Sequence, residues 1–333
     1  MAQRVAYGTL AIAVLVLLFM QDVVIAKHSV ELAGPLGDLL HRGSLIPLLF
    51  MVVLLRGALE LDRILRAKGV QPHSAFAYLM IVVLLLAPWF SAAGWLGADV
   101  RDQEGLFWQL VALLVTVMGA GVLCVLRGHP RGALPDMAAT VLMVFYVGFL
   151  GSFGLQLRCG RDIPGQEGAW LLLITLLVTK ASDIGAYFVG TAVGRHKLIP
   201  GISPGKSVEG AFGGLLASAV VAMLLVSAGG ISGLLGSGEG AFAAMLNDVI
   251  RSFTIRNDQA GISPMLRALF FGLALSAAGQ IGDLVESCFK RDSGVKDSSN
   301  LIPHYGGILD MIDSPVFAMP VAWFLLTTVW NVV

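Results

Sequence analysis

Long apolar segments with few charges dominate the sequence and restrict its fold more than any other feature. Of the 333 residues, 56% are hydrophobic and 13% are charged, which is about half the charge of an average soluble domain. So few charged side chains cannot cover a surface in water. We therefore predict an all-α, polytopic membrane protein, and exclude a soluble enzyme and a disordered scaffold. The 22 basic and 22 acidic residues leave no net charge to attract nucleic acid.

Nine segments are predicted as membrane-spanning helices, because about 20 mostly apolar residues cross ~30 Å of hydrocarbon. They are residues 5–25, 45–59, 75–96, 106–126, 137–157, 169–193, 211–235, 264–285 and 315–332. The second span is short and runs into an amphipathic stretch at 59–66, which we expect along the membrane interface. The first span is longer than the apolar core of a signal peptide, so we expect it to be retained.

Basic residues predict the orientation of the chain. With nine spans, the loops on the N-terminal side hold more Lys and Arg than the loops on the other side, which places the N-terminus in the cytoplasm. We expect residues 1–165 to contribute transmembrane helices and residues 166–333 to form the catalytic part, within one membrane domain. The polar motif loops then face the cytosol from a multi-pass protein of the inner membrane.

The first candidate site lies inside a predicted span, where Lys180 and Asp183 stand three residues apart. That spacing puts both side chains on one helical face, where they can pair. A charge at bilayer depth costs about 2.5–3.5 kcal/mol, so it is rarely without a role. The pair either holds the helix bundle together or lines a polar cavity for substrate or an ion, and we favour the cavity.

The second candidate site is the glycine-rich loop at 194–210. Ser203, Lys206 and Ser207 can donate hydrogen bonds to phosphate oxygens, and the glycines let the backbone approach a ligand. The loop is not a Walker A motif, because its two glycines are separated by one residue too few. A basic turn at the membrane surface is the alternative interpretation.

The third candidate site combines two acidic helix ends. Asp283 and Ser287 share one face at the end of the eighth span, and Asp310 and Asp313 share one face at the start of the ninth. Carboxylates together with phosphate are the ligands that Mg²⁺ prefers, so we expect the two acidic helix ends to converge on one ion. The basic residues between these ends suit a polyphosphate substrate; they are Lys290, Arg291 and Lys296. Taken singly, each would be an ordinary interfacial charge.

This cluster resembles the signature of the phosphatidate cytidylyltransferases, also called CDP-diacylglycerol synthases. The family pattern is a serine followed by Lys-Arg, then Lys-Asp, a glycine turn with His-Gly-Gly, and Asp-Arg-x-Asp. Segments 287–291, 294–298 and 301–314 match this pattern with the spacing preserved. The stretches 183–187 and 203–210 also match family segments.

The resemblance implies an enzyme of phospholipid biosynthesis, a nucleotidyltransferase that joins CTP to phosphatidate in the bilayer. The products would be pyrophosphate and CDP-diacylglycerol. It implies a catalytic set in which Asp283 and Asp310 hold Mg²⁺, Ser287 and Asp313 support them, and Lys206 binds phosphate. A second cation is left open. The resemblance adds further residues to the expected substrate contacts: Asp297, His304 and Tyr305.

Three positions depart from the family pattern. Tyr305 replaces the histidine of His-Gly-Gly, although His304 is adjacent. Met311 replaces the arginine between the two aspartates, and Ser299 replaces the glycine after Lys-Asp-Ser. An arginine lost near a triphosphate removes about 1.5–3 kcal/mol of charged hydrogen bonding. An altered substrate preference or a reduced activity therefore stays open.

Other functions fit the sequence less well. The CDP-alcohol phosphatidyltransferases carry an Asp-Gly motif, and this chain has no Asp-Gly dipeptide. A transporter that uses Lys180 and Asp183 would show an inverted repeat, and the sequence shows none. The main alternative is another membrane nucleotidyl- or phosphatidyltransferase that acts on a different lipid phosphate. The sequence leaves the oligomeric state open, with a homodimer as one arrangement.

Overall fold

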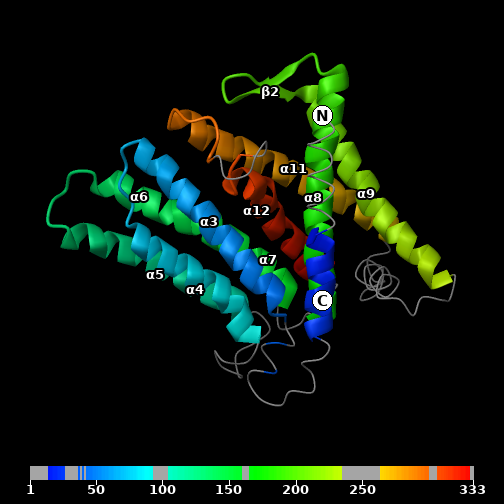
Figure 1. The fold of residues 1–333 in the computed structure, drawn as a ribbon, viewed down its shortest axis with the longest axis horizontal. Coiled ribbons are helices and arrows are strands. Elements are labelled where there is room, and N and C mark those ends of the chain that lie inside the picture. Colours follow the sequence, from blue (N-terminus) through cyan, green and yellow to red (C-terminus); the bar gives the residue numbers. More distant parts are fainter. Residues whose placement is uncertain are drawn as a thin grey trace. The chain divides into compact units, whose positions relative to one another are not determined.

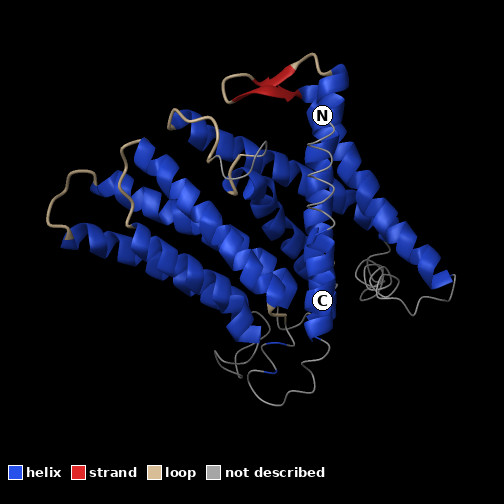
Figure 2. Ribbon diagram, in the orientation of Figure 1, coloured by secondary structure: helices blue, strands red, loops and turns tan. Residues whose placement is uncertain are grey.

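The computed structural model describes residues 14–26, 37, 40, 43–92, 104–159, 165–234, 263–299 and 306–330. These residues are mostly helical, and their strands form a single two-stranded hairpin (Figure 2). The prediction of an all-α protein is therefore confirmed. His304, Tyr305 and the first half of the predicted span at 5–25 lie outside the described residues.

Seven helices in the described ranges are long and apolar enough to cross a membrane. They are Ser74–Ala92, Gly105–Leu126, Ala133–Cys159, Gly168–Val193, Val208–Ser227, Pro264–Asp292 and Leu309–Val329. Each overlaps one of the predicted spans from the third to the ninth. A polytopic helical membrane protein is thus confirmed, whereas the count of nine spans is not.

The two remaining predicted spans fall in helices of a different kind. The second lies in α3 (Leu45–Ala67), whose second half carries several charged residues. The amphipathic stretch at 59–66 continues α3 without a break, and Glu60 and Asp62 within it are buried. The described part of the first predicted span forms a shorter apolar helix, Val14–Ala26.

Internal contacts divide the chain into two compact units. The first consists of Met1–Ala169 and Cys288–Ile312, and the second of Trp170–Ser287 and Asp313–Val333. The chain passes between them inside three helices, which are α8 (Gly165–Val193), α11 (Pro264–Asp292) and α12 (Leu309–Trp323). The sequence-based division between residues 165 and 166 stays a prediction.

The first unit is a bundle of neighbouring helices. Besides α3 it contains α4 (Ser74–Ala92), α5 (Glu104–Leu126), α6 (Ala133–Met143), the π-helical segment η2 (Val144–Phe149) and α7 (Leu150–Cys159). Helix α4 packs against α3, α5 and α7 (Figure 1). The contact of α3 with α7 is close, because a Cβ at Gly151 would collide with the side chain of Leu54.

A buried ion pair fixes the start of α3. Both Asp22 and Arg158 are fully buried, and the guanidinium of Arg158 binds Oδ2 of Asp22 at 2.6 and 2.8 Å. The other oxygen of Asp22 accepts hydrogen bonds from the amides of Ser44, Leu45 and Ile46. One carboxylate therefore satisfies both the arginine and the amides that α3 leaves unpaired at its N-terminus.

The second unit packs α8, α9 (Val208–Leu234), α11, α12 and η4 (Phe324–Val329). The strands β1 (Lys197–Ile199) and β2 (Ser203–Ser207) form an antiparallel hairpin that pairs Lys197 with Ser207. Glycines bring the helices together, since a Cβ at Gly185 or Gly272 would collide with the backbone of α9. Close backbone approach through small residues is typical of membrane helices.

Candidate active site

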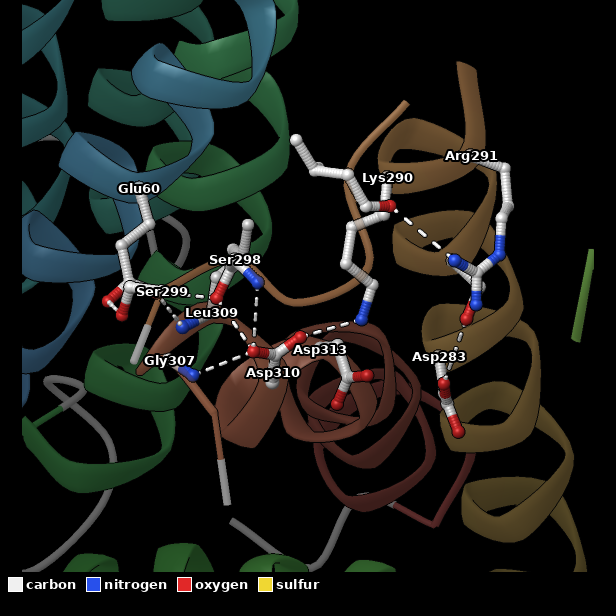
Figure 3. A network of polar contacts seen from close by, with 12 residues as sticks. Glu60, Asp283, Lys290, Arg291, Ser298, Ser299, Gly307, Leu309, Asp310 and Asp313 are labelled. Atoms are coloured by element: carbon white, nitrogen blue, oxygen red, sulfur yellow. Dashed lines mark hydrogen bonds and ion pairs between the residues drawn. The ribbon is translucent and has the colours of Figure 1, made fainter. Parts of the chain in front are cut away.

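Asp310, in the first turn of α12, receives hydrogen bonds from several sides. Its Oδ1 binds the ammonium of Lys290 at 2.6 Å. Its Oδ2 accepts from the amide of Gly307 at 2.7 Å and from the amide and the hydroxyl of Ser298 at 3.1 and 2.8 Å. Figure 3 shows these donors around the carboxylate. A carboxylate with so many donors is held in one orientation.

The turn before α12 is shaped by glycine. Gly306 has a φ of +85°, a conformation that costs a glycine little and other residues more. A Cβ at Gly306 would also collide with the carboxylate of Asp310, and a Cβ at Gly307 with Ser298 and Glu60. Both glycines are therefore needed for the backbone to lie against these side chains.

Glu60 of α3 lies beside this turn, although no sequence motif includes it. Glu60 is 2% exposed, and its carboxylate accepts four hydrogen bonds from residues 298–299 and 308–309, which we call the motif segment. The donors are the hydroxyls of Ser298 and Ser299 and the amides of Ile308 and Leu309. Sequence reasoning missed this residue. The one available signal was an acidic side chain in a largely apolar helix, which is rarely without a partner.

In the second unit, Asp283 of α11 forms an ion pair with Lys206 of β2. The Lys206 ammonium lies 2.6 Å from Oδ2 of Asp283, and the Ser287 hydroxyl lies 3.4 Å from Oδ1. The structure thus brings together a residue from the glycine-rich loop and two residues from the third predicted site. The spacing of the sequence alone did not link these two sites.

The Lys180–Asp183 pair is present as predicted, with the Lys180 ammonium 2.8 Å from Oδ2 of Asp183. The other Asp183 oxygen accepts from the hydroxyl of Ser314 at 3.3 Å. Asp313 is 5% exposed, and its carboxyl group lies near enough to Lys180, Asp183 and Asp283 for electrostatic interaction.

The remaining predicted residues lie in less constrained places. Ser203 begins β2, where it pairs with Ile199. The buried hydroxyl of Ser207 accepts a hydrogen bond from the Gly210 amide and so caps α9. The exposed set comprises Arg291, Lys296 and Asp297. The roles that the sequence predicts for these residues stay predictions.

The metal prediction joins residues of both units, since Asp310 belongs to the first and Asp283 to the second. That the two share one ion stays a prediction. Among the described residues, no three His, Cys, Asp or Glu side chains lie close enough to hold an ion by themselves. Mg²⁺ commonly takes only one or two carboxylates and completes its shell with water and substrate phosphates. The carboxylate oxygens of these aspartates are ligands of the type that Mg²⁺ prefers.

A family model described as the cytidylyltransferase family matches residues 25–329 of this chain. The chain belongs to this family. The phosphatidate cytidylyltransferase of Staphylococcus epidermidis is 31% identical over 289 residues, which cover 86% of this chain and 92% of the relative. The enzyme of that name from Bacillus subtilis is 31% identical over 267 residues, or 80% and 83% of the two chains.

A third relative matches a shorter part of the chain at higher identity. The phosphatidate cytidylyltransferase of Haemophilus influenzae is 39% identical over 154 residues, 46% of this chain and 44% of its own. The family match is much longer than the motif region from Lys180 to Ser314 and includes α3 with Glu60. The family match therefore includes helices α3 to α7.

Proposed function

We propose that this protein is a phosphatidate cytidylyltransferase, which uses CTP to convert phosphatidate into CDP-diacylglycerol. Its membership of the cytidylyltransferase family over nearly the whole chain carries the proposal. Curated relatives of that name cover most of this chain at 31% identity. The paired lysines and aspartates of the predicted sites support it, because they provide charges suited to phosphate groups.

The proposed reaction is a single displacement at phosphorus. An oxygen of the phosphatidate phosphate attacks the α-phosphorus of CTP and forms a new P–O bond. The bond from the α-phosphorus to the oxygen that bridges to the β-phosphorus breaks, and pyrophosphate leaves with that electron pair. A phosphate monoester is already largely ionised at neutral pH, so the step needs no protein base. Catalysis then consists of positioning and of neutralising charge.

The lysines supply much of that neutralisation. Lys206 and Lys290 each lie 2.6 Å from an aspartate oxygen, which orients their ammonium groups. An ammonium has three donors, so each lysine can keep its aspartate and still bind a phosphate oxygen. Arg291 and Lys296 are exposed and can meet the outer phosphates of CTP. Lys180 and Asp183 would shape the polar surface around the lipid phosphate.

Asp283 and Asp310 are the carboxylates that we assign to Mg²⁺, with Asp313 as a further candidate. Bound Mg²⁺ would neutralise phosphate charge and orient the leaving group. We further propose that the protein lies in the inner membrane with its polar loops on the cytosolic side, because CTP arrives from water whereas the acyl chains stay in lipid.

Lipid labelling tests the function directly. Purified protein in detergent, given radiolabelled CTP, phosphatidate and Mg²⁺, should produce a labelled lipid. We expect Asp283→Asn and Asp310→Asn to lower the rate by at least about a hundredfold, since each loses a charge next to the reacting phosphates. Removing Mg²⁺ with EDTA should abolish the reaction. Asp292→Asn, on α11 like Asp283 but exposed and paired with Lys68, is the matched control.

The outcomes are distinct. Unlabelled lipid with the wild-type protein contradicts the proposed function. Labelled lipid that survives both aspartate substitutions contradicts the site but not the function. Replacing phosphatidate with other lipid phosphates, or CTP with other nucleoside triphosphates, tests the alternative that the departures at Ser299, Tyr305 and Met311 altered the substrate.

A further inference from the structure

We infer that Glu60 is a positioning residue that acts on Asp310 through the motif segment. The inference rests on the proposed function, and it assigns a role to a residue of α3 that lies far from the motifs in sequence. Ser298 and Leu309, two of its partners, are separated from it by 238 and 249 residues. All the residues concerned belong to the first unit.

The geometry of the carboxylate carries the inference (Figure 3). Oε1 of Glu60 accepts from the Ser299 hydroxyl at 2.7 Å and from the Ile308 amide at 3.1 Å. Oε2 accepts from the Ser298 hydroxyl at 2.8 Å and from the Leu309 amide at 2.8 Å. Each oxygen therefore binds one donor from residues 298–299 and one from residues 308–309. The carboxylate holds together the two ends of the motif segment.

Ser298 connects this carboxylate to the predicted metal ligand. Its hydroxyl oxygen lies 2.8 Å from Oε2 of Glu60 and 2.8 Å from Oδ2 of Asp310. A hydroxyl has a single hydrogen, so Glu60 and Asp310 share this donor and Ser298 donates to one of them at a time. Moving Glu60 away would therefore change both the position of Ser298 and the hydrogen bonds that Asp310 receives.

The side chains of Glu60 and Ser298 lie directly against the backbone of Gly307. A Cβ on Gly307 would collide with the Glu60 carboxylate and with the Ser298 hydroxyl. Glu60 and Ser298 are both buried, so water cannot easily replace a lost hydrogen bond. Residues 298–299 and 307–309 are therefore fixed against the carboxylate of Glu60.

Glu60→Gln tests this role, because the two side chains have nearly the same shape. Whichever oxygen becomes the amide nitrogen, the backbone amide of Ile308 or Leu309 then meets another donor, and the serine hydroxyl on that side must turn to accept a hydrogen bond instead of donating one. We expect kcat in the CTP and phosphatidate assay to fall about ten- to a hundredfold, the range that small displacements of reacting groups cause. The KM for phosphatidate should stay within about twofold, because Glu60 does not touch the lipid in the proposed reaction.

Asp62→Asn is the matched control. Asp62 is also a buried acid of α3, but it binds Arg66, Ser74 and Tyr78 and not the motif segment. Thermal unfolding in detergent shows whether each variant folds. We expect Asp62→Asn to lower the unfolding temperature and to keep kcat within about threefold of wild type. Glu60→Gln should unfold at a temperature similar to that of Asp62→Asn and show the larger loss of kcat.

A double-mutant cycle isolates the connection. Ser299→Ala removes a hydroxyl whose partner is Glu60, and we expect it to lower kcat about two- to tenfold. In Glu60→Gln the further change Ser299→Ala should lower kcat less than it does in the wild type, because the carboxylate that holds the Ser299 hydroxyl is already replaced. If Glu60→Gln does not fold, the kcat of Ser299→Ala alone tests the role of Glu60.

The following results distinguish a failure of the proposed function from a failure of the role of Glu60. An inactive wild-type protein overturns the proposed function. An active wild type with Glu60→Gln equal to Asp62→Asn in kcat overturns the role of Glu60. Strictly additive effects of Glu60→Gln and Ser299→Ala, or an unchanged kcat in Ser299→Ala, overturn it as well.

Discussion

At the scale of single residues, burial decides what an ion pair contributes to this protein. Arg158 and Asp22 are fully buried, and the aspartate also holds the amides at the start of α3. The pair of Lys68 and Asp292 has the same chemistry, but both side chains are about half exposed or more. Buried pairs become costly when one partner is removed, whereas exposed pairs contribute little.

Arg158→Leu should therefore destabilise the protein strongly. It leaves the Asp22 carboxylate buried without its cation, and we expect a loss of about 3–5 kcal/mol in the free energy of unfolding. Lys68→Met, which breaks the exposed pair, should cost about 0–1 kcal/mol. Denaturant unfolding in detergent measures both. Similar losses in the two variants would contradict this interpretation of burial.

Residue-level patterns predicted some contacts and not others. The spacing of Lys180 and Asp183 predicted their pair, because a helix brings such neighbours together. The pairs of Lys206 with Asp283 and of Glu60 with the motif segment join residues far apart in sequence. Local spacing carries no information about such contacts. The sequence did not predict that the hydroxyl of Ser207 caps α9, and its predicted contact with phosphate stays a prediction.

At the scale of elements, hydropathy predicted the long helices well. All seven candidate spans coincide with predicted ones, because an apolar run of that length has few other ways to satisfy its backbone. Helix α3 was harder to predict. Its acidic residues Glu60 and Asp62 lie buried against protein partners, whereas its arginines are exposed. The amphipathic pattern at 59–66 therefore belongs to a helix that packs in the bundle, and its place along the membrane interface stays a prediction.

Glycine contacts between helices give a prediction at this scale. Gly272 of α11 lies against the backbone of Ser218 and Ala219 in α9, with no room for a methyl group. We expect Gly272→Ala to lower the free energy of unfolding by about 1–3 kcal/mol through overpacking. Gly121→Ala in α5 is the control, since its Cβ would meet only the Met137 side chain at 3.9 Å.

The control should behave in the opposite sense. Alanine is a better helix former than glycine by up to about 1 kcal/mol, so Gly121→Ala should leave stability unchanged or raise it. Unfolding of both variants in the same detergent is the measurement. A neutral Gly272→Ala would show that α9 and α11 do not pack as closely as described.

At the scale of the whole molecule, the balance of basic residues predicts which side each loop faces. With the N-terminus in the cytoplasm, the hairpin around Gly201 faces the cytosol, and the loop with Arg101 faces the other side. The motif pattern predicted the family, because its residues keep their spacing over a long stretch. It could not predict the two units, since the first is built from segments that are distant in the chain.

Cysteine labelling tests this orientation. In a chain whose native cysteines are replaced, Gly201→Cys should react with a membrane-impermeant thiol reagent only after the inner membrane is opened. Arg101→Cys should react in intact spheroplasts. Gly201 has open space around its Cα, so the substitution should not disturb the hairpin. The reverse pattern of labelling would invert the predicted topology and place the glycine-rich loop away from CTP.

The discontinuity of the first unit affects how the chain is synthesised. Helix α3 leaves the ribosome long before residues 298–309, which supply all four donors that bind Glu60. Until then the newborn helix carries a carboxylate without these partners, and a nascent chain stopped before α12 cannot complete the first unit. Shortened proteins that end before residue 312 should therefore be targets for membrane quality-control proteases rather than independently folding fragments.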